Sequence, residues 1–159
     1  MYKIVGDLPE NARIEVAAIL QNRLADSIDL MIQARHAHWN VKGSGFIALH
    51  ELFDKLSEDL ERYVELIAER IAQLGGIAEG TIRLAAEKSS LPDYPLTIAG
   101  EERVADLSRA IATFGNLIRK TIDQANELKD ADTVDICTEI SRGADKYLWF
   151  VEAHAQALN

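Results

Sequence analysis

One long stripe of apolar residues constrains the fold more than any other feature of this chain. Between residues 46 and 74 the large apolar side chains recur at steps of three and four residues, the spacing of one buried face of an α-helix. The members are Phe46, Leu49, Phe53, Leu56, Leu60, Tyr63, Ile67, Ile71 and Leu74. Gly75-Gly76 follows directly, as glycine often does at a helix C-terminus. The pattern predicts a long helix that buries one face.

A second helical pattern precedes this one. Pro9 suits the first turn of a helix that runs to about His38, and Gly43-Ser44-Gly45 ends the pattern. Its expected apolar positions include Ile14, Ala17, Ala18, Leu24, Ile28, Met31 and Ile32.

Two more long helices are expected in the second half of the chain. One runs from about Gly100 to Leu128, and the last has Asp132 as its expected N-cap, with Asp135 three residues on. The buried seam of the last helix is Cys137, Ile140, Ala144, Tyr147 and Val151.

A long connection separates the second and third long helices. It spans residues 77 to about 97, carries a short helix from Thr81 to Lys88, and closes with the segment Leu91–Pro95. Four long helices with one long middle connection are typical of a ferritin-like four-helix bundle with a crossover. We therefore expect an all-α fold and a single domain over residues 1–159.

Charge and cysteine content exclude several classes of function. Seventeen basic against 26 acidic side chains give a net charge of −9, which argues against a nucleic-acid-binding surface spread over the whole protein. Cys137 is the single cysteine, so neither an intrachain disulfide nor a thiolate zinc cluster can form. The N-terminal segment does not resemble a secretory signal, and no stretch reads as a membrane span. The expected location is the cytoplasm.

Candidate metal ligands follow the same helix as the apolar stripe. His50 and Asp54 are four residues apart, as are Glu65 and Glu69, so each pair shares a face. Eleven residues separate Asp54 from Glu65, a spacing that returns to within about 20° around the helix. All four therefore lie on one stripe beside the apolar seam.

The two pairs are too far apart along one helix to share an ion. Eleven residues rise about 16 Å, whereas metal ligands lie about 2 Å from the metal. A second copy, placed antiparallel across a two-fold axis midway along the helix, brings His50 opposite Glu69 and Asp54 opposite Glu65. His38, at the end of the first helix, supplies a second imidazole. Two histidines with several carboxylates suit ferrous iron, and also zinc or manganese.

Simpler explanations exist for each residue. Glutamates at helical spacing are commonly a solvated face, and a histidine beside a seam can be a packing or capping residue. Glu65 and Glu69 could also pair with Arg62 or Arg70 along the helix. The residues alone leave these alternatives open.

Several motifs closely resemble those of the Dps family of mini-ferritins. The resemblance covers nearly the whole chain, including the segments of the last helix that begin at Asp132 and Asp145. The matching motifs are His38-Trp39-Asn40, Gly43 to Phe46, Leu49-His50 through Asp54, Ala68-Glu69-Arg70 and Leu74-Gly75-Gly76.

The resemblance implies a hollow shell of twelve identical subunits. It further implies an enzyme, a ferroxidase that oxidises Fe(II) at inter-subunit sites, with hydrogen peroxide preferred over dioxygen, and stores Fe(III) as mineral without haem. This activity protects against oxidative damage. One subunit would contribute His38, His50 and Asp54, and its partner Glu65 and Glu69. Many relatives have aspartate at the position of Glu65. We expect the glutamate of this chain to affect occupancy of the second iron position.

The resemblance also gives roles to residues outside the ligand set. It places Trp39 beside the iron, as an aromatic residue that absorbs stray oxidising equivalents; the alternative is a core tryptophan at a helix end. It places acidic residues along a three-fold pore that admits Fe(II), here Asp130 and Asp135, with Glu139 one turn later. For these the alternative is the ordinary preference for acids at a helix start.

DNA binding is the property of some relatives that this sequence does not support. Only Lys3 precedes the first helix, and residues 154–159 contain no lysine or arginine. We expect weak or no DNA binding and no association with the nucleoid, because neutralising phosphates requires several cations. A DNA-coating shell with little iron chemistry is the alternative function. A ferritin or bacterioferritin site inside each bundle is disfavoured, since no Glu-x-x-His occurs.

Overall fold

The computed structural model describes residues 1–43, 45–95 and 101–156. These residues form helices and connections, with no strand among them. The helices are α1 (Glu10–Asn40), α2 (Phe46–Gln73), α3 (Ile82–Lys88), α4 (Glu101–Glu127) and α5 (Ala131–Gln156). The predicted all-α class, the four long helices and the short helix of the crossover are confirmed. The expected helix start at Gly100 and the break residue Ser44 lie outside the described residues.

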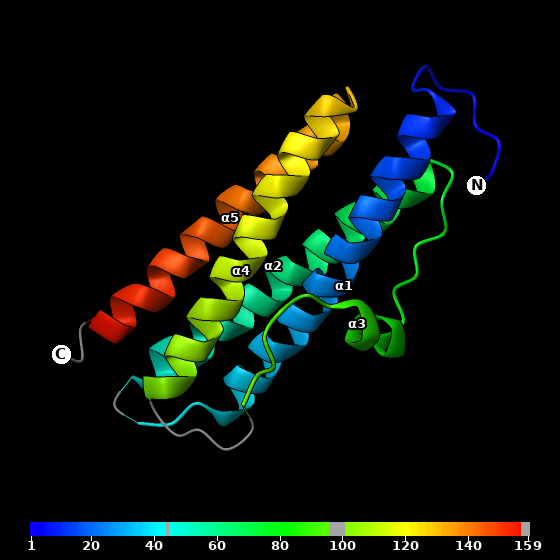
Figure 1. Cartoon of the computed structure of the whole chain (residues 1–159). Helices are drawn as coiled ribbons and strands as arrows, with labels where there is room; N and C mark the ends of the chain where they lie inside the picture. The colour runs from blue at the N-terminus through cyan, green and yellow to red at the C-terminus, as the bar shows by residue number, and fades with distance from the viewer. Residues whose placement is uncertain (44, 96–100, 157–159) are drawn as a thin grey trace.

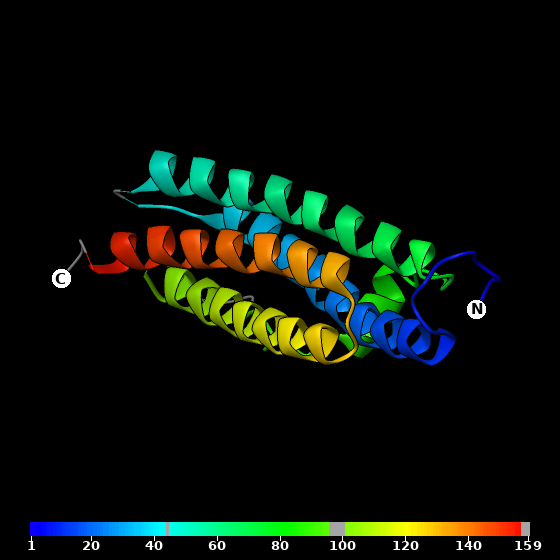
Figure 2. The same ribbon diagram turned by 90° about the horizontal axis from the view of Figure 1, so that it is seen from above.

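The four long helices form two antiparallel pairs, α1 with α2 and α4 with α5, that pack into one bundle (Figures 1 and 2). Because α2 and α4 run in the same direction, the chain between them must travel the length of the bundle. The short helix α3 lies on this path against α1 (Figure 1). In the part of the chain that is described, no helix is both long and apolar enough to cross a membrane.

The apolar stripe of α2 forms the centre of the core, as its spacing predicts. Phe53, Leu60 and Ile67 are almost fully buried, and the remaining members are buried too, except Phe46 at the first position of the helix. The seam predicted for α5 is buried along its whole length, from Cys137 to Val151.

The apolar face predicted for α1 is only partly correct. Leu24 and Ile28 are buried, but Ile14 and Ile32 are nearly half exposed. The helix packs against α2, α3 and α4, so its buried surface wraps around several sides and includes polar residues such as Asp26. A single-face pattern describes such a helix poorly.

Buried polar groups of α1 hold the crossover in place. Asp26 accepts a hydrogen bond of 2.7 Å from the backbone N–H of Ser90 and pairs with Arg23 at 2.9 Å. Asp29 accepts a hydrogen bond of 2.6 Å from the hydroxyl of Ser89. These contacts fasten the segment that follows α3 to the bundle.

The residue that caps the N-terminus of α5 differs from the one predicted from the sequence. The helix begins at Ala131, so Asp130 and not Asp132 is the capping residue. The Asp130 carboxylate accepts from the Thr133 backbone N–H at 3.1 Å and from the Thr133 hydroxyl at 2.6 Å. Lys129, which has a φ of 60°, makes a tight left-handed turn after α4 and thereby places Asp130 at the cap.

Candidate metal centre

Two predicted ligands, His38 and His50, lie together at one end of the bundle. His38 is in the last turn of α1, and His50 is in the second turn of α2, which follows after a short connection. Their rings stack with centroids 3.7 Å apart. His38 Nδ1 lies 2.8 Å from the backbone carbonyl of His50, and His50 Nδ1 lies 3.0 Å from that of His38. The two residues therefore hold each other through a reciprocal pair of hydrogen bonds.

These contacts define which ring nitrogens are free. A carbonyl oxygen only accepts, so in the neutral form of each ring Nδ1 carries the proton. Each Nε2 then keeps its lone pair. An imidazole that donates one N–H to a backbone carbonyl and presents the other nitrogen is the usual state of a metal-binding histidine. Helix-end carbonyls lack helical partners, which is why the last turn of α1 can offer such an acceptor at His38.

Asp54, one turn after His50, is held by a side chain of the neighbouring helix α1. Arg35 on α1 donates to the Asp54 carboxylate and forms an ion pair with it, and both side chains are partly exposed. Arg35 is a site residue that sequence reasoning missed. The available signal was its position one turn before His38, which places it on the same face of α1.

The two remaining predicted ligands, Glu65 and Glu69, are exposed on α2. Their nearby arginines are engaged elsewhere: Arg62 pairs with Glu139, and Arg70 lies 2.6 Å from Asp130. The alternative in which Glu65 and Glu69 pair with these arginines along the helix is therefore not what the structure shows.

The ligand set is divided along α2. The helix is continuous from Phe46 to Gln73, so Asp54 and Glu65 are about 16 Å apart along its axis. Within the described residues, no three His, Cys, Asp or Glu side chains come together as a metal site. A single chain thus carries two separate groups, which we call the histidine half (His38, His50, Asp54) and the glutamate half (Glu65, Glu69). Their union across a two-fold axis stays a prediction.

Trp39, next to His38, lies on the surface of the single chain. Its side chain is 67% exposed, so the interpretation of Trp39 as a core residue is wrong for this chain by itself. An exposed tryptophan at this point is available to a neighbouring subunit or to the metal centre.

The three acidic residues assigned to a pore have different surroundings. Asp130 is only 3% exposed, and its contacts with Arg70 and Thr133 account for it as a helix cap. Glu139 is exposed but pairs with Arg62 across to α2. Asp135 is exposed at the start of α5. The assignment of these residues to a pore stays a prediction.

Comparison with known proteins defines the class to which this fold and these histidines belong. The family model described as a ferritin-like domain matches residues 17–159. Among solved structures, a Mycobacterium smegmatis Dps superposes with a TM-score of 0.91 at 30% identity, covering 96% of this chain and 94% of that one. The chain is therefore a ferritin-like protein.

The similar sequences identify the family within this class. The chain is 42% identical over 156 residues to a DNA protection during starvation protein of Agrobacterium fabrum, a match that covers 98% of this chain and 96% of the relative. DpsA14 from Streptomyces coelicolor has a TM-score of 0.90 at 30% identity, covering 94% of this chain and 89% of that one. The chain belongs to the Dps family, in which oxidation and storage of iron is the general role.

Proposed function

We propose that this protein oxidises Fe(II) with hydrogen peroxide at sites shared by two subunits and stores the Fe(III) inside a closed shell of twelve copies in the cytoplasm. The observation that carries the proposal is the reciprocal hydrogen bonding of His38 and His50, which leaves each Nε2 free to bind a metal. A structural or packing pair of histidines has no need of two free nitrogens on adjacent rings.

Each half of the site has a distinct task. His38 and His50 bind Fe(II) as neutral donors, and Asp54 adds a negative charge. Glu65 and Glu69 of a partner compensate the further charge that appears when iron is oxidised. Carboxylate oxygens favour Fe(III) over Fe(II) because their charge stabilises the more highly charged ion.

The proposed reaction consumes iron and peroxide together. Two Fe(II) ions each lose one electron to one hydrogen peroxide molecule, whose O–O bond breaks to give two hydroxide ions. Transfer of both electrons at one site avoids the release of a hydroxyl radical. Hydrolysis of Fe(III) then releases protons and builds the mineral. Zn(II) and Mn(II) fit the same donors and would act as competing ions.

Glu65 sets the expected difference from relatives that have aspartate at this position. Its side chain is longer by one methylene, so the carboxylate moves by about a bond length while its charge is kept. The proposal predicts that the first Fe(II) binds normally and that the second is held more weakly.

Stopped-flow measurement of Fe(II) oxidation tests the proposal. Metal-free protein is mixed with Fe(II) and then with peroxide or air, and Fe(III) formation is followed by absorbance. The variant His50→Ala/Asp54→Ala should remain an assembled oligomer and oxidise iron slowly. A matched control is His154→Ala/Asp123→Ala, which removes the same residue types from α5 and α4. Wild-type rates in the first variant would refute the assignment.

A further inference from the structure

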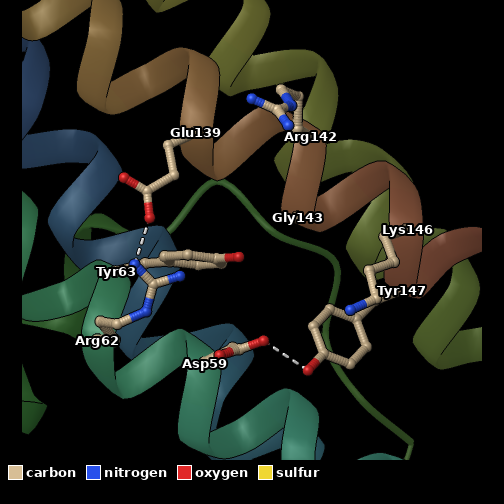
Figure 3. A pocket seen from close by; sticks show the side chains of 8 residues that line it. All are labelled: Asp59, Arg62, Tyr63, Glu139, Arg142, Gly143, Lys146 and Tyr147. Carbon is tan, nitrogen blue, oxygen red and sulfur yellow. Dashed lines mark hydrogen bonds and ion pairs between the residues drawn. The ribbon is translucent and has the colours of Figure 1, made fainter.

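A pocket between α2 and α5 is not explained by the metal centre. Its volume is about 300 Å³, at the lower end of the range for small-molecule pockets. Figure 3 shows the lining side chains from both helices, with Asp59, Arg62 and Tyr63 on α2 and Glu139, Arg142 and Lys146 on α5. From Asp54 to Tyr63 the helix turns by about 180°, so Tyr63 lies on the opposite face of α2 from Asp54, whereas Arg62 lies about 60° around the helix from Glu65.

The carboxylates of this pocket are already engaged. Asp59 accepts a hydrogen bond of 2.6 Å from the hydroxyl of Tyr147, and Glu139 pairs with Arg62 (Figure 3). The lining holds three cationic side chains beside these two carboxylates, although acidic residues outnumber basic ones, 26 to 17, in the whole chain. The pocket therefore has the opposite charge balance to the rest of the protein.

Two of the three cations have no acidic partner. Arg142 and Lys146 are exposed and one helical turn apart on α5, so their side chains share a face. Among the described residues neither forms an ion pair, and Lys146 Nζ lies over the Tyr147 and Phe150 rings, 5.9 and 5.6 Å from their centroids. Two like charges at this spacing repel each other until an anion binds between them.

A neutral hydrogen-bond donor lies beside these cations. The Tyr63 ring packs so closely on α5 that a Cβ at Gly143 would lie 1.8 Å from its hydroxyl. Glycine at this position admits the phenol and places its hydroxyl in the pocket (Figure 3). Burial raises the pKa of Tyr63, and Asp59 raises it further, so the hydroxyl keeps its proton at neutral pH.

We propose that this pocket binds a phosphate group. A small tetrahedral dianion fits the volume, the charges of Arg142 and Lys146, and the Tyr63 hydroxyl. Arginine is suited to such a ligand because its guanidinium donates two parallel hydrogen bonds to a phosphate. The inference does not depend on the proposed ferroxidase, since none of the residues belongs to either half of the metal site.

Phosphate binding to metal-free protein tests this inference. Iron must be removed completely with a chelator, because ferric mineral itself binds phosphate. Titration of the assembled protein with inorganic phosphate, in chloride buffer, is followed by calorimetry or by broadening of the ³¹P resonance. A parallel titration with glycerol phosphate shows whether the bound phosphate is free or esterified, and the tighter ligand identifies the source.

The variant Arg142→Gln/Lys146→Gln should lower the affinity by about tenfold or more, since each lost charge-assisted hydrogen bond costs about that factor. The control Arg83→Gln/Lys120→Gln removes one arginine and one lysine from exposed positions on α3 and α4. It should bind phosphate as the wild type does. Equal losses in both variants, or no binding of either phosphate by wild-type protein, would overturn the proposal.

Discussion

Gly143 and Gly115 make a matched test of how α5 packs against α2. Both are glycines within long helices, where alanine is favoured by about 1 kcal/mol. A Cβ at Gly115 would meet its nearest neighbour, the Cβ of Ala144, at an ordinary 3.7 Å. A Cβ at Gly143 would lie 1.8 Å from the Tyr63 hydroxyl oxygen and 2.8 Å from the carbon that bears it.

The expected effects of the two substitutions have opposite signs. Gly115→Ala adds a methyl group without displacing anything, so it should stabilise the fold by up to about 1 kcal/mol. Gly143→Ala forces the rigid Tyr63 ring to leave its buried position. Overpacking of this kind costs about 1–3 kcal/mol, and because the hydroxyl oxygen and one ring carbon of Tyr63 both overlap we expect the upper end. After the helix-propensity gain is subtracted, the net loss is about 2 kcal/mol.

Thermal unfolding of metal-free proteins at equal concentration measures both effects. For a chain of this length, a loss of about 2 kcal/mol lowers Tm by about 4–8 °C. In a Tyr63→Ala background the phenol ring that blocks the new methyl group is absent, so Gly143→Ala should no longer destabilise the fold. A Gly143→Ala protein at least as stable as wild type would refute the close packing of Tyr63 on α5.

Three further predictions concern a thiol, a buried carboxyl and DNA. Cys137 is fully buried and burial raises its pKa to about 12, so a thiol reagent should modify it only after unfolding; rapid reaction of folded protein would contradict this. Burial also raises the pKa of Asp26 above its ordinary value of 3.8, with Arg23 and Ser90 opposing the shift, so ionisation weakens the fold. The free energy of unfolding of the wild type should therefore fall, relative to that of Asp26→Asn, as pH rises from 3.8 through the folded-state pKa. Urea unfolding at a series of pH values measures both proteins. A constant difference between their free energies of unfolding would show the reasoning to be wrong. In a gel-shift assay at physiological salt, iron-free protein should leave duplex DNA unshifted, whereas a clear shift would mean that phosphate contacts outweigh the net charge of −9.

The sequence predicts those parts of the fold that depend on periodic burial. The stripe of α2 and the seam of α5 follow from spacing alone, because each helix buries one face against the core. The prediction is only partly correct for α1, where Leu24 and Ile28 are buried but Ile14 and Ile32 are nearly half exposed and Asp26 is buried. That helix is surrounded on several sides, and its polar residues bind a crossover whose path is set by tertiary structure.

The candidate site shows the same division between local pattern and tertiary contact. Spacing placed His50 with Asp54 and Glu65 with Glu69 on one helix, and the structure keeps them there. Spacing could not show that His38 and His50 exchange hydrogen bonds, or that Arg35 holds Asp54, since both contacts join different helices. The choice of Asp130 over Asp132 as the cap of α5 likewise depends on a tight turn at Lys129 that adjacent acidic residues do not specify.

Co-assembly of two defective subunits tests most directly whether the site is shared. One variant lacks the histidine half (His50→Ala/Asp54→Ala) and the other lacks the glutamate half (Glu65→Ala/Glu69→Ala). Each alone should oxidise Fe(II) slowly. In a mixed dimer, one of the two sites combines both intact halves and the other combines both defective halves. With random pairing, half of the dimers are mixed, so roughly a quarter of the sites should recover.

The decisive measurement is the rate of peroxide-driven Fe(II) oxidation by the co-expressed mixture, compared with that of each variant alone. Recovery to about a quarter of the wild-type rate would establish an iron site built from two subunits. A mixture no faster than its slow components, or a single variant that retains the full rate, would contradict the account.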